Sequence, residues 1–351
     1  MTKWQGADPN DTVDTPQLKE LIQTVTSLID HFQPLRHLGS GAYGQVFLAQ
    51  LKNNPGAQYA IKRVRSGAES EYCDVEREIW YLAQARGHPN LCQLRGAYNK
   101  QRSDGTCTTY IAMEAYDRSL ASVLEAGDRI PFALCLDQLS SGLLFLHELH
   151  IIHRDLSAGN VFVQHSADKT PQWRLVIGDF GLARQLATGR SARVRTRSAS
   201  AAEARRMRRL LPIDAKCSTL TSHVTTREYR APEIFLKSKF YNTAIDCWSL
   251  GLILYHVATG AEAFDISREI PSSAVFAENI WPQFNNPLSN PLSLKAPTTA
   301  AQLSASTAIG PPVHLLEGLD PLPQAVLAGL LRLSPLSRLS AAALRAKFVT
   351  Q

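Results

Sequence analysis

The sequence predicts an α+β protein in which a small β-rich lobe is followed by a larger helical lobe. Short β-like runs dominate from residue 32 to about residue 116, and long apolar helical runs dominate beyond Ser119. The 351 residues, 44% of them hydrophobic, are enough for two such lobes. We therefore divide the chain into an extension (1–31), a first lobe (32–116) and a second lobe (117–350).

The N-terminal extension contains one predicted helix. Residues 16–32 begin with Pro and space apolar side chains at helical intervals. The apolar face could pack on the fold or bind a partner, and an ordinary amphipathic helix favours packing.

In the first lobe, the runs QVFLAQL, QYAIKRV, LCQLRGAY and TYIAMEA are typical of strands. Only residues 71–85 show helical spacing, which gives the order strand, strand, strand, helix, strand, strand. In the second lobe, LCLDQLSSGLLFLHELH and TAIDCWSLGLILYHVATG predict long buried helices. Residues 185–217 and 285–312 fit neither lobe and are predicted to be flexible insertions.

The net charge of +6 is concentrated in one segment. Residues 184–217 hold nine arginines and Lys216 against Glu203 and Asp214, so this segment carries +8 and the rest of the chain −2. A solvated insertion is the ordinary interpretation, and nuclear import or binding of an acidic partner is the alternative.

Composition also limits the location and the type of site. The first residues lack a basic region followed by an apolar stretch, and no run approaches the roughly 18 apolar residues needed to span a bilayer. We expect a soluble protein of the cytoplasm, the nucleus or both, with no direct binding of membranes or nucleic acids. Six scattered cysteines indicate neither a zinc site nor a disulfide framework.

Residues 38–50, LGSGAYGQVFLAQ, contain a GxGxxGxV pattern between two strand-like runs. Glycines let a backbone approach phosphates closely. A dinucleotide-binding unit and a simple glycine-rich hairpin are the alternatives. Because the run after Val46 continues as β-structure, no helix follows to receive a pyrophosphate, which disfavours the dinucleotide alternative.

Lys62 follows in the alternating strand YAIK, on the same face as Ala60. A buried lysine needs a counter-charge, and the predicted helix offers Glu76 and Glu78. We choose Glu78 because an apolar face follows it.

The segment HRDLSAGN (153–160) lies between a predicted helix and a β-like run, so it is a loop. Asp155 could accept a hydroxyl proton, and Asn160 could offer an oxygen to a divalent cation. Asp179, in GDFGLAR, could hold the same cation against phosphates.

In this order, GSGAYGQV, YAIK, REI, HRDLSAGN, DFG and YRAPE resemble the motifs of eukaryotic protein kinases over about residues 32–350. The resemblance implies a bilobal protein-kinase-like fold, ATP and Mg²⁺ as cofactors, and protein substrates. It implies that Lys62 pairs with Glu78 and contacts the α- and β-phosphates, that Asp155 is the catalytic base, and that Asn160 and Asp179 bind Mg²⁺. It assigns the nucleotide to Leu38, Gly39, Ser40, Gly41, Ala42, Tyr43, Gly44, Val46, Ala60, Lys62, Met113, Glu114, Tyr116 and Phe162.

Residues 221–235, TSHVTTREYRAPEIF, resemble cyclin-dependent and MAP kinases, although Glu228 stands where that group has Trp. This implies Ser/Thr substrates, a groove formed by Thr226 and Arg230, and a preference for Pro after the target residue. It also implies that an upstream kinase phosphorylates Thr221, which then pairs with Arg154. A cyclin-like subunit is not indicated, because the PSTAIRE run is missing.

Two further contacts follow from the resemblance. Asp246 would brace the backbone of the catalytic loop, and Arg338 would pair with Glu233. Two rival functions remain: a kinase-like scaffold of weak or no activity that binds partners through its insertions, and a kinase of small molecules. The complete catalytic set disfavours the scaffold.

One position departs from the family pattern. Serine/threonine kinases usually place Lys two residues after the base, where this chain has Ser157. The missing cation is expected to weaken charge stabilisation at the γ-phosphate, so that Ser157→Lys would raise the turnover rate.

Overall fold

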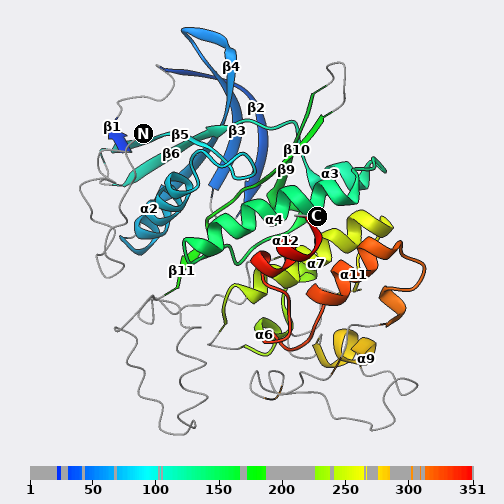
Figure 1. The fold of residues 1–351 in the computed structure, drawn as a ribbon. Coiled ribbons are helices and arrows are strands. Elements are labelled where there is room, and N and C mark those ends of the chain that lie inside the picture. The colour runs from blue at the N-terminus through cyan, green and yellow to red at the C-terminus, as the bar shows by residue number, and fades with distance from the viewer. Residues whose placement is uncertain are drawn as a thin grey trace, which may run out of the picture. The chain divides into compact units, whose positions relative to one another are not determined.

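The computed structural model describes residues 22–24, 31–41, 44–66, 69–101, 103, 106–166, 172–186, 226–237, 241–264, 266, 276–284, 302, 309 and 313–349. The chain divides into two compact units, each shown in Figure 1. Unit 1 comprises residues 1–117 and 178–183, and unit 2 comprises residues 118–177 and 184–351. The main division lies one residue after the predicted lobe boundary, whereas residues 178–183, which we assigned to the second lobe, belong to unit 1.

Unit 1 is a six-stranded sheet with one long helix, and from Phe32 onward its elements follow the predicted order. Its sheet order is β1-β5-β6-β4-β3-β2, with antiparallel neighbours except for the parallel pair β1 and β5. Helix α2 contacts β4 and β5. The elements are β1 (Ile22–Thr24), β2 (Phe32–Gly41), β3 (Gly44–Leu51), β4 (Asn54–Ser66), α2 (Glu69–Gln84), β5 (Leu94–Gln101) and β6 (Cys107–Glu114).

The predicted helix at 16–32 is wrong where the structure describes it. Residues Ile22–Thr24 form strand β1, which pairs with β5. The outer edge of β5 offers unpaired backbone groups, and Ile22 and Thr24 are β-branched, so edge pairing competes with the helical spacing. Phe32 also begins a strand, and residues 1–21 and 25–30 lie outside the described residues.

Strand alternation separates the two faces of the sheet in unit 1. Ile61 is fully buried in an apolar cluster with Phe32, Ala49 and Ala112. Because neighbouring strand residues point to opposite faces, Lys62 lies on the other face from this cluster. Val46 of β3 is paired with Lys62 across the ladder, so the strand that begins at Gly44 lies directly beside the lysine.

Unit 2 is mainly helical and contains two small sheets, β10-β9-β7 and β11-β8. Helix α7 contacts α4 and α11, and its residues 244–254 are all buried, as the apolar sequence predicts. The elements are β7 (Arg118–Ser119), α3 (Leu120–Glu125), α4 (Phe132–Glu148), β8 (Ile151–Ile152), η2 (Ala158–Asn160), β9 (Val161–Ser166), β10 (Gln172–Ile177), β11 (Arg184–Gln185), η3 (Arg227–Tyr229), α6 (Pro232–Phe235), α7 (Ala244–Thr259), η4 (Phe276–Ile280), α9 (Trp281–Phe284), η5 (Val313–Leu315), α11 (Pro321–Leu330) and α12 (Ala341–Phe348).

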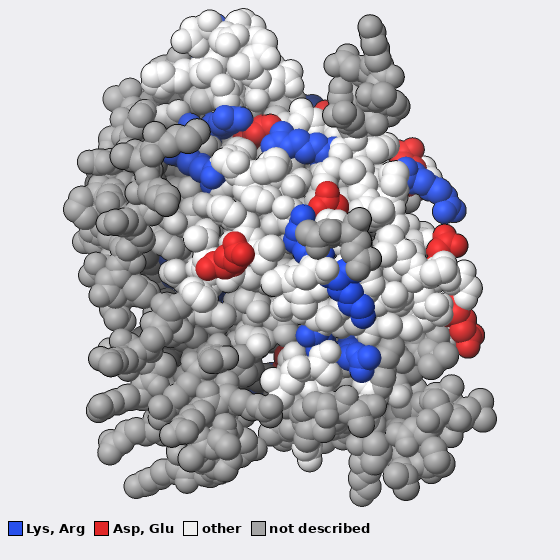
Figure 2. Space-filling model, in the orientation of Figure 1, with Lys and Arg blue, Asp and Glu red and all other residues white. Residues whose placement is uncertain are grey.

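The two predicted insertions lie largely outside the described residues. Of 185–217, Gln185 ends β11 and Leu186 donates its backbone N–H to the His150 carbonyl at 2.7 Å. Of 285–312, only residues 302 and 309 are described. On the face drawn in Figure 2, acidic and basic side chains of the described residues are interspersed. No helix in the described ranges is long and apolar enough to cross a membrane.

Candidate active site

A charged cluster in unit 1 joins three of the predicted residues. Lys62 lies on β4, Glu78 on α2, and Asp179 on the 178–183 segment. The Lys62 Nζ donates to Glu78 Oε1 at 2.7 Å, to Glu78 Oε2 at 2.9 Å and to Asp179 Oδ1 at 3.2 Å. Of the two glutamates that the sequence offered, Glu78 is therefore the one that reaches the lysine.

Electrostatics keep Lys62 charged although it is only 6% exposed. Burial by itself would lower the pKa of Lys62, but the carboxylates of Glu78 and Asp179 raise it above its ordinary value. Burial also raises the pKa of Glu78, and the charge of Lys62 opposes this rise. With both carboxylates ionised, the cluster carries one positive and two negative charges. The Asp179 side chain is 37% exposed, against 4% for Glu78, so the excess negative charge lies on the accessible carboxylate.

Two glycines allow the backbone to pack closely around the lysine. The Gly181 N–H donates to Asp179 Oδ1 at 3.3 Å, and a Cβ at Gly181 would lie 3.2 Å from the same oxygen and 3.7 Å from Lys62 Nζ. Gly44, with φ of +137°, admits no side chain, because a Cβ would meet the Arg63 carbonyl oxygen at 2.2 Å. Gly44 therefore fixes the close approach of β3 to β4.

In unit 2, Asp246 of α7 holds the backbone of the catalytic loop. Its carboxylate accepts hydrogen bonds from the backbone N–H groups of His153 and Arg154, both at 2.9 Å. Arg154 takes a left-handed conformation with φ of 71°. The bracing contact expected of Asp246 is present. Sequence reasoning missed His147 of α4, whose Nε2 lies 3.1 Å from Asp246 Oδ2, because the two residues are far apart in the chain.

The Asp155 carboxylate is oriented from both sides. Asn160 Nδ2 donates to the Asp155 carbonyl at 2.8 Å and to Asp155 Oδ2 at 3.0 Å. The Thr226 backbone N–H donates to Asp155 Oδ1 at 3.4 Å. These contacts fix the carboxylate that would accept a proton. They also orient the Asn160 side chain: its Nδ2 faces Asp155, so its Oδ1 points away from Asp155.

The donor set suits a hard divalent cation. Mg²⁺ prefers oxygen ligands and is commonly bound through one or two carboxylates together with substrate phosphates. Asp179 supplies a partly exposed carboxylate and Asn160 an amide oxygen. These two residues belong to different units.

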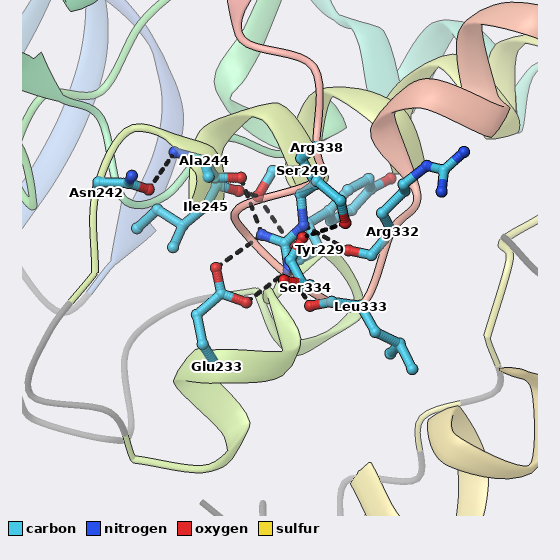
Figure 3. A network of polar contacts seen from close by, with 11 residues as sticks. Tyr229, Glu233, Asn242, Ala244, Ile245, Ser249, Arg332, Leu333, Ser334 and Arg338 are labelled. Carbon is cyan, nitrogen blue, oxygen red and sulfur yellow. Dashed lines mark hydrogen bonds and ion pairs between the residues drawn. The ribbon is translucent and has the colours of Figure 1, made fainter. Parts of the chain in front are cut away.

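A buried ion pair anchors the segment that follows the predicted activation segment (Figure 3). The Arg338 Nη1 and Nη2 donate to the two carboxylate oxygens of Glu233, both at 2.7 Å. Three backbone carbonyls also accept from Arg338, and its guanidinium lies 5.0 Å from the centre of the Trp248 ring. The predicted contact between Arg338 and Glu233 is thus present, in a bidentate form.

Two arginines lie near the buried Tyr241. The Arg154 guanidinium is 5.6 Å from the centre of the Tyr241 ring. Burial raises the pKa of Tyr241, while the positive charges of Arg154 and Arg184 oppose this rise. Sequence reasoning did not single out Arg184, although it follows directly after DFGLA. Thr221, the predicted partner of Arg154, lies outside the described residues.

Of the predicted substrate residues, Thr226 contacts Asp155, and Arg230 lies within range of its charge. Thr226 provides the backbone contact described above. Arg230 is 7% exposed, with its guanidinium 5.6 Å from the centre of the Phe235 ring. Burial and the charge of Arg227 lower the pKa of Arg230, and the charge of Asp155 opposes this effect.

The residues assigned to nucleotide binding occur in both units. Ala60 is paired with Met113 in the ladder between β4 and β6, and Glu114 ends β6 with its backbone N–H bound to the Gln93 carbonyl. Phe162 lies on β9 of unit 2, whereas Leu38, Gly39, Ser40, Gly41, Gly44, Val46 and Tyr116 lie in unit 1. Ala42 and Tyr43 lie outside the described residues.

Comparison with known proteins gives a family match over most of the chain. Residues 32–348 match the family described as "Protein kinase domain". A protein named "Putative cyclin-dependent kinase F-2", from Oryza sativa subsp. japonica, is 30% identical over 92% of this chain and 91% of its own length.

Other relatives carry MAP-kinase and cyclin-dependent kinase names. "Mitogen-activated protein kinase 15" from Caenorhabditis elegans is 31% identical over 70% of this chain, and "Cyclin-dependent kinase 11B" from Mus musculus is 30% identical over 74%. The chain spans 47% and 30% of the lengths of these two proteins. The predicted family and bilobal fold class are confirmed: the chain belongs to the protein kinase family, among the relatives of MAP kinases and cyclin-dependent kinases (the CMGC group).

Proposed function

We propose that this protein transfers the γ-phosphoryl group of Mg-ATP to serine and threonine hydroxyls of protein substrates. The observation that carries the proposal is the buried Lys62, held protonated between Glu78 and Asp179. A fixed buried ammonium beside an accessible carboxylate suits a phosphate chain that arrives with a divalent cation.

Each residue of the site would have a separate task. Lys62 would bind and orient the α- and β-phosphates, and Asp179 and Asn160 would hold Mg²⁺. Bound Mg²⁺ would neutralise negative charge on the phosphate oxygens. Asp155, held by Asn160 and Thr226, would orient the substrate hydroxyl and accept its proton.

The proposed substrate preference rests on residues 226–230 and on the names of the relatives. The Thr226 backbone contacts the proposed base, and the buried Arg230 lies within range of its charge. By resemblance to proline-directed kinases, we propose that Arg230 favours Pro after the target residue. We also propose that the substrates are proteins and that this protein is located in the cytoplasm, the nucleus or both.

We also propose that phosphorylation of Thr221 by an upstream kinase regulates the site. Arg154 and Arg184 both act on the pKa of Tyr241, so positive charge gathers near this ring, which supports a phosphate-binding role for Arg154. The transfer rate of Thr221→Ala should fall and should not respond to pretreatment with an activating kinase. A variant as active as the wild type would contradict this regulation.

A peptide array tests the proposed reaction. Wild-type protein, Asp155→Asn and the control Asp320→Asn would be incubated with Mg-ATP and peptides that carry Ser, Thr or Tyr, with and without a following Pro. Asp320 is exposed and its side chain does not cap α11. Asp155→Asn should lower the rate by roughly 10²- to 10⁴-fold, the usual contribution of a general base, while Asp320→Asn should not.

The same array separates the alternatives. Equal signals from wild type and Asp155→Asn would reject the enzyme and favour a scaffold that binds partners through its insertions. Transfer to a small alcohol but to no peptide would favour a small-molecule kinase. Transfer mainly to Tyr peptides would reject the Ser/Thr assignment, and equal rates with and without Pro would reject proline direction.

A further inference from the structure

Ser157 has an environment that its sequence position did not predict. Ser157 is 1% exposed, and its backbone is extended, with φ of −152° and ψ of 164°. The Ser157 Oγ accepts a hydrogen bond from the Asn160 backbone N–H at 3.3 Å, and the Ser157 carbonyl accepts from the same group at 3.1 Å. The side chain therefore caps the short turn η2.

The turn is held by other contacts of unit 2. It contacts α3, β7 and β9, and the Tyr229 hydroxyl forms a hydrogen bond with the backbone of Ala158. A Cβ at Gly159 would lie 3.7 Å from Ser157 Oγ, an ordinary contact distance. Two side chains, Ser157 and Tyr229, thus bind backbone groups of one three-residue turn.

The cap leads directly to the proposed chemistry. Asn160 ends the turn, and its amide nitrogen reaches both the carbonyl and the carboxylate of Asp155. If the turn shifted, the Asn160 side chain would lose its contacts with Asp155, and its amide oxygen would no longer be oriented to bind a cation. The contacts run from Ser157 to Asn160 and from Asn160 to Asp155.

We propose that Ser157 is a positioning residue, whose hydroxyl fixes Asn160 for cation binding and for its contact with Asp155. This inference rests on the proposed function. It replaces the expectation that Ser157 only marks a missing cation. A lysine side chain offers no acceptor to the Asn160 N–H, which would keep only the backbone carbonyl of residue 157, and it would bring a charge to a buried position, so Ser157→Lys should lower the turnover rate.

The test uses Ser157→Ala, Ser157→Thr and Ser157→Lys, with Ser340→Ala as the matched control. Ser340 caps α12 in the same way, accepting from the Ala343 N–H at 3.2 Å. The first readout is the thermal stabilisation by ADP with Mg²⁺ compared with ADP alone, which needs no turnover. The second is the Mg²⁺ concentration that gives the half-maximal transfer rate.

Ser157→Ala should lose most of the Mg²⁺-dependent stabilisation and raise the half-maximal Mg²⁺ concentration by roughly 10-fold or more, as loss of a partner that orients a metal ligand commonly does. Ser157→Thr should restore both values, because it keeps the hydroxyl. Ser340→Ala should lower the melting temperature without changing either value.

Wild-type Mg²⁺ dependence in Ser157→Ala, or a faster Ser157→Lys, would overturn the positioning role while leaving the proposed kinase intact. A wild type that binds Mg-ADP but transfers nothing would reject the proposed function, and loss of the Mg²⁺ increment in Ser157→Ala would still support the positioning role. A wild type without any Mg²⁺ increment would overturn both.

Discussion

Two buried ion pairs, one in each unit, differ in how completely they are enclosed. The Arg338 and Glu233 side chains are 0% and 3% exposed, and the guanidinium also contacts three carbonyls and the Trp248 ring. The Lys62 and Glu78 side chains are 8% and 4% exposed, but a second carboxylate, Asp179, contacts the ammonium from a partly exposed position.

The difference favours a structural role for Arg338 and Glu233 and supports the role proposed for Lys62. The charges of Arg338 and Glu233 balance each other, and the N–H donors of the guanidinium are bound to Glu233 and to nearby carbonyls. Few donors therefore remain for a ligand. The Lys62 cluster has an excess negative charge on its accessible side. Unbalanced charge around a group with a raised pKa is typical of a binding or catalytic site.

The largest effect on folding is expected at the enclosed pair. Arg338→Met would leave the Glu233 carboxylate buried without its bidentate partner, which should lower the free energy of unfolding by about 3–5 kcal/mol. Urea unfolding of the variant, the wild type and the control Arg129→Met, whose parent side chain is exposed, measures this. A loss below about 1 kcal/mol would show that the enclosed pair is not the stronger structural contact.

Lys62→Met should act mainly on the reaction. Removal of a preorganised charge at the phosphates should lower the transfer rate by roughly 10²- to 10³-fold. The exposed Arg65 on the same strand provides the control Arg65→Met, which should keep the rate. A Lys62→Met protein with the wild-type rate would remove the distinction between the two pairs.

The stability of Lys62→Met should also depend on pH in a defined direction. Burial raises the pKa of Glu78, and Lys62, whose charge and hydrogen bond oppose this rise, is removed in the variant. The folded state then binds the Glu78 proton more tightly than the unfolded state, so stability falls as the pH rises above the ordinary Glu value of about 4.3. The stability difference from wild type should therefore grow between pH 5 and pH 8, and a constant difference would contradict it.

The sequence predicted the pairs because their members lie in recognisable motifs. Lys62, Glu78 and Asp179 were assigned from a strand, a helix and a loop, and Arg338 was assigned to Glu233 across the second lobe. The choice of Glu78 over Glu76 needed only the apolar face that follows it. Such assignments follow from local pattern and family resemblance, and they require no knowledge of packing.

The failures have a shared physical cause. Residues 22–24 show helical spacing, but they form β1 because an edge of β5 is available, and that edge is distant in the sequence. His147 reaches Asp246 only when α4 and α7 pack together. The capping contact of Ser157 was not predicted either, because it forms in a turn that contacts α3, β7 and β9.

The smallest effect is expected at an ion pair that neither unit encloses. Arg118 and Asp128 form a salt bridge with side chains 40% and 44% exposed. Water screens both charges, and ordering two long side chains costs entropy, so a double-mutant cycle with Arg118→Ala and Asp128→Ala should give a coupling of about 0.2–1 kcal/mol. The coupling should shrink further at 1 M salt, where the screening length is only about 3 Å. Urea unfolding of the four proteins measures this coupling. A salt-insensitive coupling above about 2 kcal/mol would mean that burial does not determine how much each of the three ion pairs contributes to stability.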